Sequence, residues 1–275
     1  MRIDSHQHFW NYSANEYGWL GDGMESLRRD FYPEHLEPEL LANRMDGCIA
    51  VQARQTLEET VWLLDLADES AFVKGVVGWA PLAAPDFEAI AERLASQKKL
   101  VGLRHVVQSE ADPTSLENPD FQRGVAAMRS RDWVYDILIF ERQLPAAIAF
   151  VDRFPNNRFV LDHVAKPRIR DGEFETWATR MRGMARRPNV WCKVSGMVTE
   201  ADWKGWQPAH LRPYLDLVLE AFTPQRLLFG SDWPVCLVAS TYGRWVQTVE
   251  DWSRELSDAE RGRLFGETAR EVYAL

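Results

Sequence analysis

The chain has 275 residues, of which 46% are hydrophobic, and it carries a formal net charge of -9 with a sequence pI near 5.3. Its length would allow about two domains, but α/β barrels of about 250 residues form one domain, and its apolar content suffices for a large core. The negative charge argues against nucleic acid and anionic membrane as partners, because phosphate groups and acidic lipids would repel it.

Short apolar, β-branched runs alternate along the chain with longer stretches of helical spacing, a pattern typical of parallel strands joined by helices. We predict eight strands, at residues 2-6, 46-51, 73-79, 100-104, 133-138, 158-162, 190-194 and 226-230. Strand-helix units in this number, without a Ser/Gly-rich linker or an internal repeat, favour an α/β fold with a single (β/α)8 TIM-type barrel domain over residues 1-275. In such a barrel the active site lies at the C-terminal ends of the strands.

Helices between the strands are predicted from their caps. Thr56 and Glu59 form a capping box that opens a helix reaching about Glu69, and Ser257 opens the last helix in the same way. Pro85 fits the first position of another helix. Two apolar stripes that we assign to core packing comprise Leu211, Leu215, Val218 and Phe222, and Leu144, Ile148 and Val151.

A His-x-His pair, His6 and His8, follows the first predicted strand. Side chains at i and i+2 project to the same face of a strand, about 7 Å apart along the chain, so both imidazoles can reach one small object. That object is either a metal ion or a substrate carbonyl that needs hydrogen-bond donors. Asp232 ends the last strand, and we predict that the first and last strands lie side by side, which would bring a carboxylate to the imidazoles.

The same rule gives candidate functional residues at all eight strand ends. They are His6 and His8; Gln52 and Arg54; Trp79; Arg104 and His105; Asp136; Asp162, His163 and Lys166; Ser195; and Ser231 and Asp232. Each residue alone has an equally good structural interpretation, but four of the six histidines of the chain belong to this set. Their common location at one face favours a functional site.

Long aromatic loops are expected over this C-terminal face. The segment from Phe9 to Tyr32 carries Trp10, Tyr12, Tyr17 and Trp19, and a later loop carries Trp203 and Trp206. Long loops in compact domains are often lids. The aromatic rings either pack against the C-H faces of a sugar or anchor the loops on the barrel, and the sequence leaves both interpretations open.

The three cysteines, Cys48, Cys192 and Cys236, lie in apolar, strand-like stretches without the spacing of metal ligands. We therefore expect reduced thiols in the core rather than disulfides. The first residues, Met-Arg-Ile-Asp-Ser-His, contain no apolar signal region, and no apolar run approaches the roughly 18 residues that span a bilayer. A cytoplasmic protein is expected.

Six motifs run in order along the whole chain: Ile3-Asp-Ser-His6-Gln-His8-Phe-Trp10, Val51-Gln52-Ala, Gly102-Leu-Arg104-His105, Leu161-Asp162-His163-Val-Ala-Lys166-Pro167, Lys193-Val-Ser195-Gly196 and Phe229-Gly-Ser-Asp232-Trp233-Pro234. Together they resemble the amidohydrolase superfamily, specifically its amidohydrolase-related branch of sugar lactonases such as L-fuconolactonase and L-rhamnonolactonase. The resemblance implies a (β/α)8 barrel in which His6, His8, His163 and Asp232 converge on the reacting carbonyl.

The resemblance also bears on metals. Superfamily members with two metals use a bridging lysine or glutamate and two later histidines, whereas the strand ends at Arg104 and Asp136 offer no such lysine and only His163 remains of the pair. This departure argues against a two-metal site. His6, His8, His163 and Asp232 form an acceptable set for a single divalent ion such as zinc, with room for water. Because the lactonase branch implies activity without metal, no cofactor is required and this ion is optional.

The implied reaction is the hydrolysis of an L-fuconolactone-like aldonolactone to the open-chain aldonic acid. A lactone has a good alkoxide leaving group, so a carboxylate that activates water and donors for the developing oxyanion suffice. We expect Asp232 to act as the base and His6, His8 and His163 to hold the carbonyl oxygen or the water. The candidate substrate-binding residues are Gln52, Arg104, His105, Asp136, Lys166, Trp10 and Trp233.

Three alternatives stay open. Arg54, Arg104, Arg168 and Arg170 could serve a lactonase for an aromatic-derived dicarboxylate lactone. A decarboxylase with one metal ion would use the same histidines and Asp232. A non-catalytic sugar-binding protein would keep the aromatic loops but would not need an acid at the eighth strand end. The expected partner is a small-molecule sugar lactone, and the sequence leaves the sugar, the ring size and the oligomeric state undefined.

Overall fold

Parallel strands form the centre of the computed structural model, which describes residues 1-112 and 114-275. Over these residues, eight strands pair in the order β1 to β8, each parallel to the next. They are Ile3–Gln7 (β1), Gly47–Val51 (β2), Val73–Gly78 (β3), Leu100–His105 (β4), Val134–Ile137 (β5), Phe159–Leu161 (β6), Val190–Val194 (β7) and Leu227–Phe229 (β8). Every predicted strand is confirmed, with ends that differ by at most one residue.

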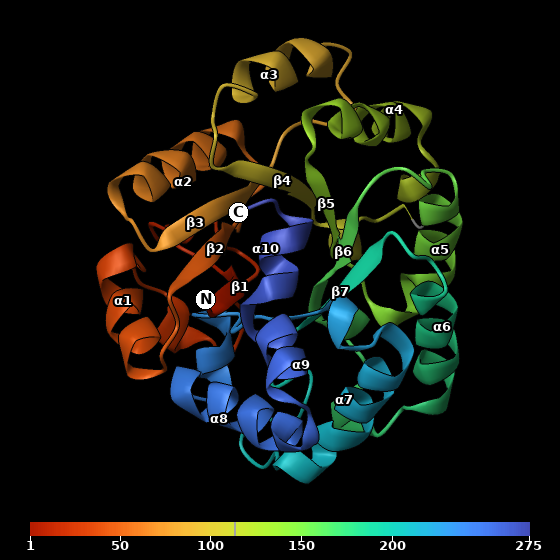
Figure 1. The fold of residues 1–275 in the computed structure, drawn as a ribbon. Helices are drawn as coiled ribbons and strands as arrows, with labels where there is room; N and C mark the ends of the chain where they lie inside the picture. Colours follow the sequence, from red (N-terminus) through yellow and green to blue (C-terminus); the bar gives the residue numbers. More distant parts are fainter. Residues whose placement is uncertain (113) are drawn as a thin grey trace.

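The first and last strands meet and close the sheet into a barrel (Figure 1). The backbone N-H of Asp232 donates to the carbonyl oxygen of His6 at 2.8 Å, and that of His8 donates to the carbonyl oxygen of Trp233 at 2.7 Å. Gln7 and Trp233 form a parallel bridge between these two bonds. The predicted (β/α)8 barrel is therefore confirmed.

Helices surround the barrel, as Figure 1 shows. They are Pro33–Ala42 (α1), Leu57–Glu69 (α2), Phe87–Leu94 (α3), Pro119–Met128 (α4), Leu144–Asp152 (α5), Glu175–Ala185 (α6), Pro208–Phe222 (α7), Tyr242–Trp252 (α8), Asp258–Gly262 (α9) and Thr268–Val272 (α10). The stripe on α7 is buried as predicted, whereas Ile148 on α5 is only partly buried.

The predicted helix starts are partly confirmed. Thr56 caps α2 by accepting the backbone N-H of Glu59, and Ser257 forms the expected capping box with Glu260. The carboxylate of Glu59 does not return to Thr56, however; it accepts the backbone N-H groups of Ala53 and Arg54 instead. The prediction for Pro85 is wrong, because α3 begins at Phe87 after Asp86.

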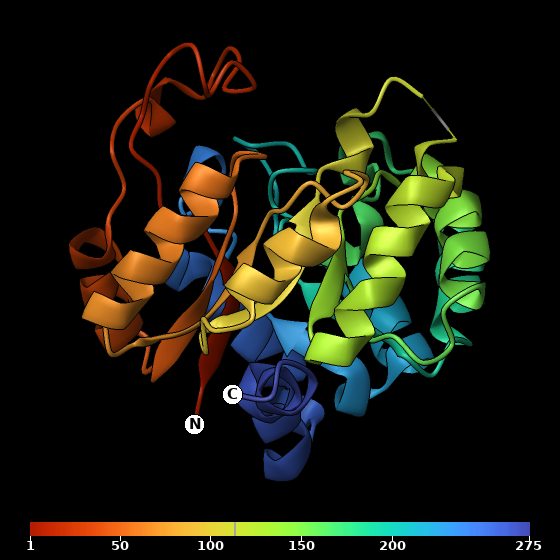
Figure 2. The same cartoon turned by 90° about the horizontal axis from the view of Figure 1, so that it is seen from above.

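The barrel interior is apolar at the N-terminal ends of the strands. Strand side chains alternate between the two faces of the sheet, so every second residue points inward. The inward-facing apolar residues are Ile3, Ile49, Val51, Val77, Val101, Val134, Val160 and Leu228. Ala269, Val272 and Tyr273, from α10 and the residue that follows it, pack against them and cover this end. Figure 2 shows α9 and α10 at the end of the barrel opposite the loop of residues 9-32.

Two further expectations concern the cysteines and the membrane. Cys48, Cys192 and Cys236 are buried and free, which confirms the prediction of reduced core thiols. Within the ranges that the structure describes, none of the helices combines the length and the apolar character that a bilayer crossing requires.

The contact between Tyr273 and Asp136 yields the first testable prediction. The Tyr273 hydroxyl lies 2.8 and 2.9 Å from the two carboxylate oxygens of Asp136, and both side chains are buried. Tyr273→Phe should lower the free energy of unfolding by about 1-3 kcal/mol, because a buried carboxylate loses a donor. Urea denaturation measures this loss. Tyr214→Phe, which removes a longer bond of 3.3 Å to the Glu173 carbonyl oxygen, is the control, and an equal loss in both variants would contradict the prediction.

Candidate active site

The backbone of the barrel seam brings His6, His8 and Asp232 together. The hydrogen bond from Asp232 N-H to His6 lies directly beside the one from His8 N-H to Trp233. Asp232 adopts a left-handed backbone conformation with φ 59°, in which a non-glycine residue is strained. The prediction that the two ends of the chain meet at the site is confirmed by these contacts.

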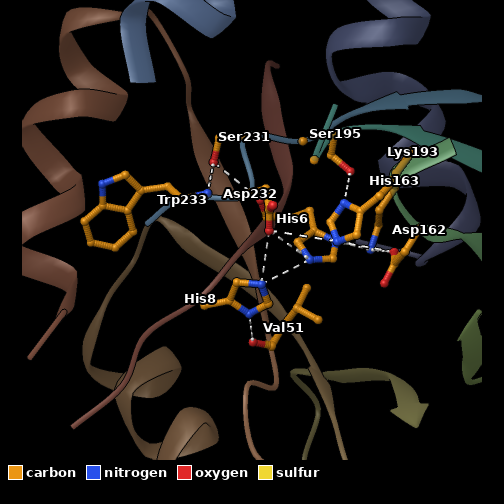
Figure 3. Close-up of polar contacts among 12 residues, drawn as sticks. His6, His8, Val51, Asp162, His163, Lys193, Ser195, Ser231, Asp232 and Trp233 are labelled. Carbon is orange, nitrogen blue, oxygen red and sulfur yellow. Dashed lines mark hydrogen bonds and ion pairs between the residues drawn. The ribbon is translucent and has the colours of Figure 1, made fainter. Parts of the chain in front are cut away.

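Four side-chain atoms converge at the C-terminal end of the barrel (Figure 3). The Nε2 atoms of His6 and His8 lie 3.2 Å apart. Asp232 Oδ1 lies 3.4 Å from His8 Nε2, 3.8 Å from His6 Nε2 and 3.9 Å from His163 Nε2. All four side chains are buried. The structure therefore gathers the four residues for which the sequence predicts a catalytic role.

A strained turn holds His163 in this cluster. After β6, the four residues His163, Val164, Ala165 and Lys166 all have positive φ angles, between 47° and 58°. Left-handed backbone costs roughly 1-2 kcal/mol per residue outside glycine. Trp177 stabilises the turn by donating its indole N-H to the Val164 carbonyl oxygen at 2.8 Å.

Gly196, which follows β7, allows the imidazole of His163 to lie against the backbone. It has a φ of 63°, and a Cβ atom at this position would lie only 2.5 Å from His163 Nδ1. Its neighbour Ser195 places its hydroxyl oxygen 2.8 Å from the same Nδ1. The Ser195-Gly196 pair therefore fixes both the position and the hydrogen bonding of the His163 ring.

Hydrogen-bond partners assign the protons on the imidazole rings. His8 Nδ1 lies 2.7 Å from the carbonyl oxygen of Val51, which can only accept, so His8 carries its proton on Nδ1. For His6, the guanidinium Nη1 of Arg104, which can only donate, lies 3.3 Å from Nε2, so Nε2 accepts and the proton lies on Nδ1, 3.3 Å from Asp162 Oδ1. In these tautomers the Nε2 atoms of His6 and His8 present lone pairs to each other and to Asp232.

The pKa values of the cluster agree with neutral imidazoles beside an ionised carboxylate. Burial lowers the pKa of His6 well below its usual range and lowers that of His163 to about 4. Burial by itself raises the pKa of Asp232, but its proximity to His163, His8 and His6 outweighs burial and holds the pKa below its ordinary value. Neutral rings and a carboxylate thus form a group of converging acceptors.

This group of acceptors fits a divalent metal ion. A tetrahedral zinc site with ligand bonds of about 2.0-2.1 Å has ligand atoms roughly 3.3 Å apart, close to the separations from His6 and His8 given above. In addition, the second ring nitrogen of each histidine faces a hydrogen-bond partner: Asp162 for His6, Val51 for His8 and Ser195 for His163. Metal-bound histidines almost always have such a partner.

A buried ionic network lies on the barrel side of His6. Lys193 Nζ, from β7, lies 2.5 Å from Asp136 Oδ2, 3.1 Å from Asp162 Oδ1 and 3.3 Å from His6 Nδ1. The guanidinium of Arg104 lies 3.0 Å from the other Asp162 oxygen. Buried charges are tolerated where they are paired in this way. Lys193 begins the motif Lys193-Val-Ser195-Gly196, but it was not among the predicted site residues.

A pocket of about 680 Å³ opens above the cluster. His8, His163 and Asp232 line it together with the polar side chains of Glu16, Arg54, Gln55, Arg104, Gln108, Lys166 and Glu200 and the apolar side chains of Trp19, Met24, Leu138, Phe140, Trp203 and Val235. Glu16 and Glu200 were missed because they lie in loops, where strand periodicity carries no information. Lys166 lies 3.6 Å from Glu200, so the wall offers a donor and an acceptor side by side.

The predicted substrate-binding residues divide into two groups. Arg104 and Lys166 line the pocket. Gln52 and Asp136 instead point into the barrel, where Asp136 pairs with Lys193 and Gln52 contacts the Arg104 carbonyl oxygen. Both are fully buried, so their prediction as substrate contacts needs correction: an inward-facing strand residue reaches the pocket only if it lies at the very end of the barrel.

His105 and the two tryptophans also lie away from the pocket. Strand alternation turns His105 outward, where its Nε2 lies 2.6 Å from Glu110. The Trp10 indole N-H donates to the Arg29 carbonyl oxygen, and the indole packs against Phe31. Trp233 also packs against the Phe31 ring. Trp10 and Trp233 are therefore anchors for the loop of residues 9-32 rather than pocket walls.

The aromatic side chains of the two loops divide into residues that line the pocket and residues that are buried. Trp19 and Trp203 line the pocket, one from each loop. Tyr17 is buried, and Trp206 is buried with its indole N-H bonded to the Ala239 carbonyl oxygen at 2.7 Å. Each loop thus has a buried aromatic anchor and an aromatic side chain in the pocket.

Comparison with known proteins gives a consistent family. The family model described as amidohydrolase matches residues 3-275. The sequence is 47% identical over 288 residues to an L-fucono-1,5-lactonase of Burkholderia multivorans, a match that covers 100% of this chain and 96% of that protein. It is 39% identical over 281 residues to an L-fucono-1,5-lactonase of Burkholderia ambifaria, covering 100% and 96%.

A solved structure gives the same result. The crystal structure of an amidohydrolase from Burkholderia multivorans with bound zinc superposes with a TM-score of 0.96 at 47% identity. The match covers 100% of this chain and 99% of that chain.

The buried carboxyl of Glu59 at the pocket edge yields a prediction about pH. Burial raises its pKa from 4.5 to about 7, despite hydrogen bonds from Ala53 and Arg54. Between these pH values the folded protein binds more protons at this group than the unfolded chain does, so this contribution to stability falls as pH rises. Glu59→Gln cannot ionise. Its stability relative to the wild type should therefore improve by about 3 kcal/mol from pH 4.5 to above pH 7.

Urea denaturation at pH 5 and pH 8 tests the effect of Glu59→Gln. Glu58→Gln changes the neighbouring, exposed residue and serves as the control, because its carboxyl stays in contact with water. A stability difference between Glu59→Gln and the wild type that does not change with pH would show that the buried carboxyl has an ordinary pKa.

Proposed function

Because the chain belongs to the amidohydrolase family, we propose that it hydrolyses a sugar lactone, an aldonolactone of the L-fuconolactone type, to the open-chain aldonic acid. The observation that carries this proposal is the convergence of Asp232 with the Nε2 atoms of three imidazoles at the floor of a pocket. The two L-fucono-1,5-lactonases that match the chain over its full length support the substrate class.

Asp232 is the base in this proposal. Its carboxylate is ionised at neutral pH and lies at the pocket floor, where it takes a proton from a water molecule. The Nε2 lone pair of His8, 3.4 Å from Asp232 Oδ1, accepts the second hydrogen of the same water and orients it. The water oxygen forms a bond to the carbonyl carbon while the bond from that carbon to the ring oxygen breaks.

The hydrogen-bond donors for the substrate's carbonyl oxygen must come from other residues, because in the assigned tautomers the Nε2 atoms of His6 and His8 accept rather than donate. Arg104 and Lys166 line the pocket and carry N-H groups that can donate to the developing oxyanion. Asp232 then transfers the proton that it removed from water to the departing ring oxygen, which becomes a hydroxyl group. Lactone and water thus give a hydroxy acid, which releases one proton to the solvent as its carboxyl ionises.

His6, His8 and Asp232 have ligand atoms close enough to hold a single divalent ion, and His163, whose Nε2 lies 3.9 Å from Asp232 Oδ1, would complete the set; the zinc-bound Burkholderia multivorans structure supports this. When bound, such an ion polarises the carbonyl and lowers the pKa of water.

The chemistry of the pocket wall favours a polyhydroxylated ring. Carboxylates at Glu16 and Glu200 lie near the cations Arg54 and Lys166, and such donor and acceptor pairs suit hydroxyl groups. Trp19 and Trp203 offer aromatic faces to the C-H groups of a sugar. A dicarboxylate lactone is less well suited, because the cations of the wall are already paired with carboxylates: Arg54 with Glu16, Lys166 with Glu200 and Arg104 with Asp162.

The first prediction about activity concerns the base. Asp232→Asn should lower turnover by about 10²-fold or more, because an amide cannot take a proton from water. Asp202→Asn, in the loop after β7 and outside the residues that line this pocket, is the control and should leave turnover unchanged. Turnover is measured with a pH indicator that reports acid release from the lactone. Retention of more than about a tenth of the activity by Asp232→Asn would contradict this role.

The second prediction concerns the substrate. Purified protein, assayed with the pH indicator against a panel of aldonolactones, should release acid from one stereochemical series, because the polar side chains of the wall are fixed. The same panel with a chelator measures how much of the rate depends on a divalent ion. Release of carbon dioxide from aromatic acids, with no activity on any lactone, would support the decarboxylase alternative instead.

A further inference from the structure

The pocket floor already contains a fixed cation beside the imidazole cluster. The guanidinium of Arg104 is 4% exposed, and its Nη1 lies 3.0 Å from Asp162 Oδ2 and 3.3 Å from His6 Nε2. Its Nη2 donates to the Gln52 carbonyl oxygen. Acceptors on three separate parts of the barrel therefore hold this side chain in one position.

Arg104 uses the same lone pair that a metal ion would need. A neutral imidazole has one ring nitrogen that can accept, and in His6 the nitrogen that faces Arg104 Nη1, at 3.3 Å, is Nε2. A guanidinium has N-H donors and no acceptor, and it stays charged. Its Nη1 therefore donates to His6 Nε2 in the observed arrangement. A metal ion and Arg104 cannot both use this lone pair.

The charge balance of the network adds to this competition. Two cations, Arg104 and Lys193, face three carboxylates, Asp136, Asp162 and Asp232, around the neutral His6. The group has a net charge of -1, which a divalent ion would change to +1. Without Arg104 the net charge would be -2, which a divalent ion would neutralise. Both the contact and the charge thus oppose a metal while Arg104 is in place.

We propose that Arg104 is the resident cation of the imidazole cluster and that it lowers the affinity of the site for a divalent metal ion of the zinc type by competing for His6. This inference concerns metal affinity in the absence of substrate, so it stands whether or not the proposed lactone hydrolysis is correct.

The experiment is a zinc titration of the apoprotein in competition with a chromophoric chelator, which gives a dissociation constant without any assay of activity. Arg104→Gln should bind zinc about tenfold more tightly than the wild type or better, because it removes both the competing donor and a unit of positive charge. Arg104→Lys retains the charge but has a shorter reach, and it should bind zinc about threefold more tightly.

Arg54→Gln is the matched control. Arg54 also lines the pocket, but it pairs with Glu16 and lies 3.8 Å from Glu59 instead of contacting an imidazole. Its substitution removes the same unit of charge from the same pocket and should change zinc affinity by less than about twofold. Affinity of Arg104→Gln equal to that of the wild type, or an equal gain in Arg54→Gln, would overturn the proposal.

A measurement on the wild-type protein keeps the test independent of how well the variants fold. In a crystal structure of the zinc-loaded wild-type protein, the Arg104 guanidinium should have moved away from His6 Nε2. Zinc bound to His6 Nε2 with Arg104 Nη1 still about 3.3 Å from that atom, as in the present arrangement, would show that the two cations do not compete.

Discussion

Two backbone hydrogen bonds at the barrel seam underlie the rest of the structure. The amide of Asp232 donates to His6, and the amide of His8 donates to Trp233, so residues from opposite ends of the chain become neighbours. The parallel strand order from β1 to β8 makes this closure possible. Because the bonds involve the same residues whose side chains form the cluster, closing the barrel and assembling the site are one event.

Below the cluster, the barrel interior changes from apolar to ionic within a few residues. Tyr273 reaches up from the end of the chain and bonds Asp136, which pairs with Lys193, and Lys193 in turn contacts Asp162 and His6. Unpaired charges here would be costly in the absence of water, and the alternation of carboxylates and cations offsets that cost. The covered end of the barrel is thereby connected to the pocket floor.

The proton positions on the imidazoles follow from this surrounding shell and determine what the site can do. A carbonyl oxygen at Val51 and a carboxylate at Asp162 accept the Nδ1 protons of His8 and His6. The Nε2 atoms are therefore acceptors for a cation or for water. Donors for a substrate oxygen must come from the pocket wall, where Arg104 is held between the two tasks of donating to substrate and donating to His6.

The sequence by itself determined the strands, the barrel and the set of candidate residues at the strand ends, because periodicity and strand ends are local and the barrel rule places all strand ends on one face. The four clustered residues were singled out within that set by the resemblance of their motifs to the amidohydrolase superfamily. Only the tertiary structure decided which way each neighbouring side chain points. Asp136 and His105 lie near pocket-lining Arg104 in the sequence or across the sheet, yet one faces the barrel interior and the other faces outward. A shift of one position along a strand turns a side chain to the other face of the sheet. A position one layer deeper in the barrel places an inward-facing side chain below the pocket. Glu200 reaches the pocket from a loop, whose path depends on contacts distant in sequence.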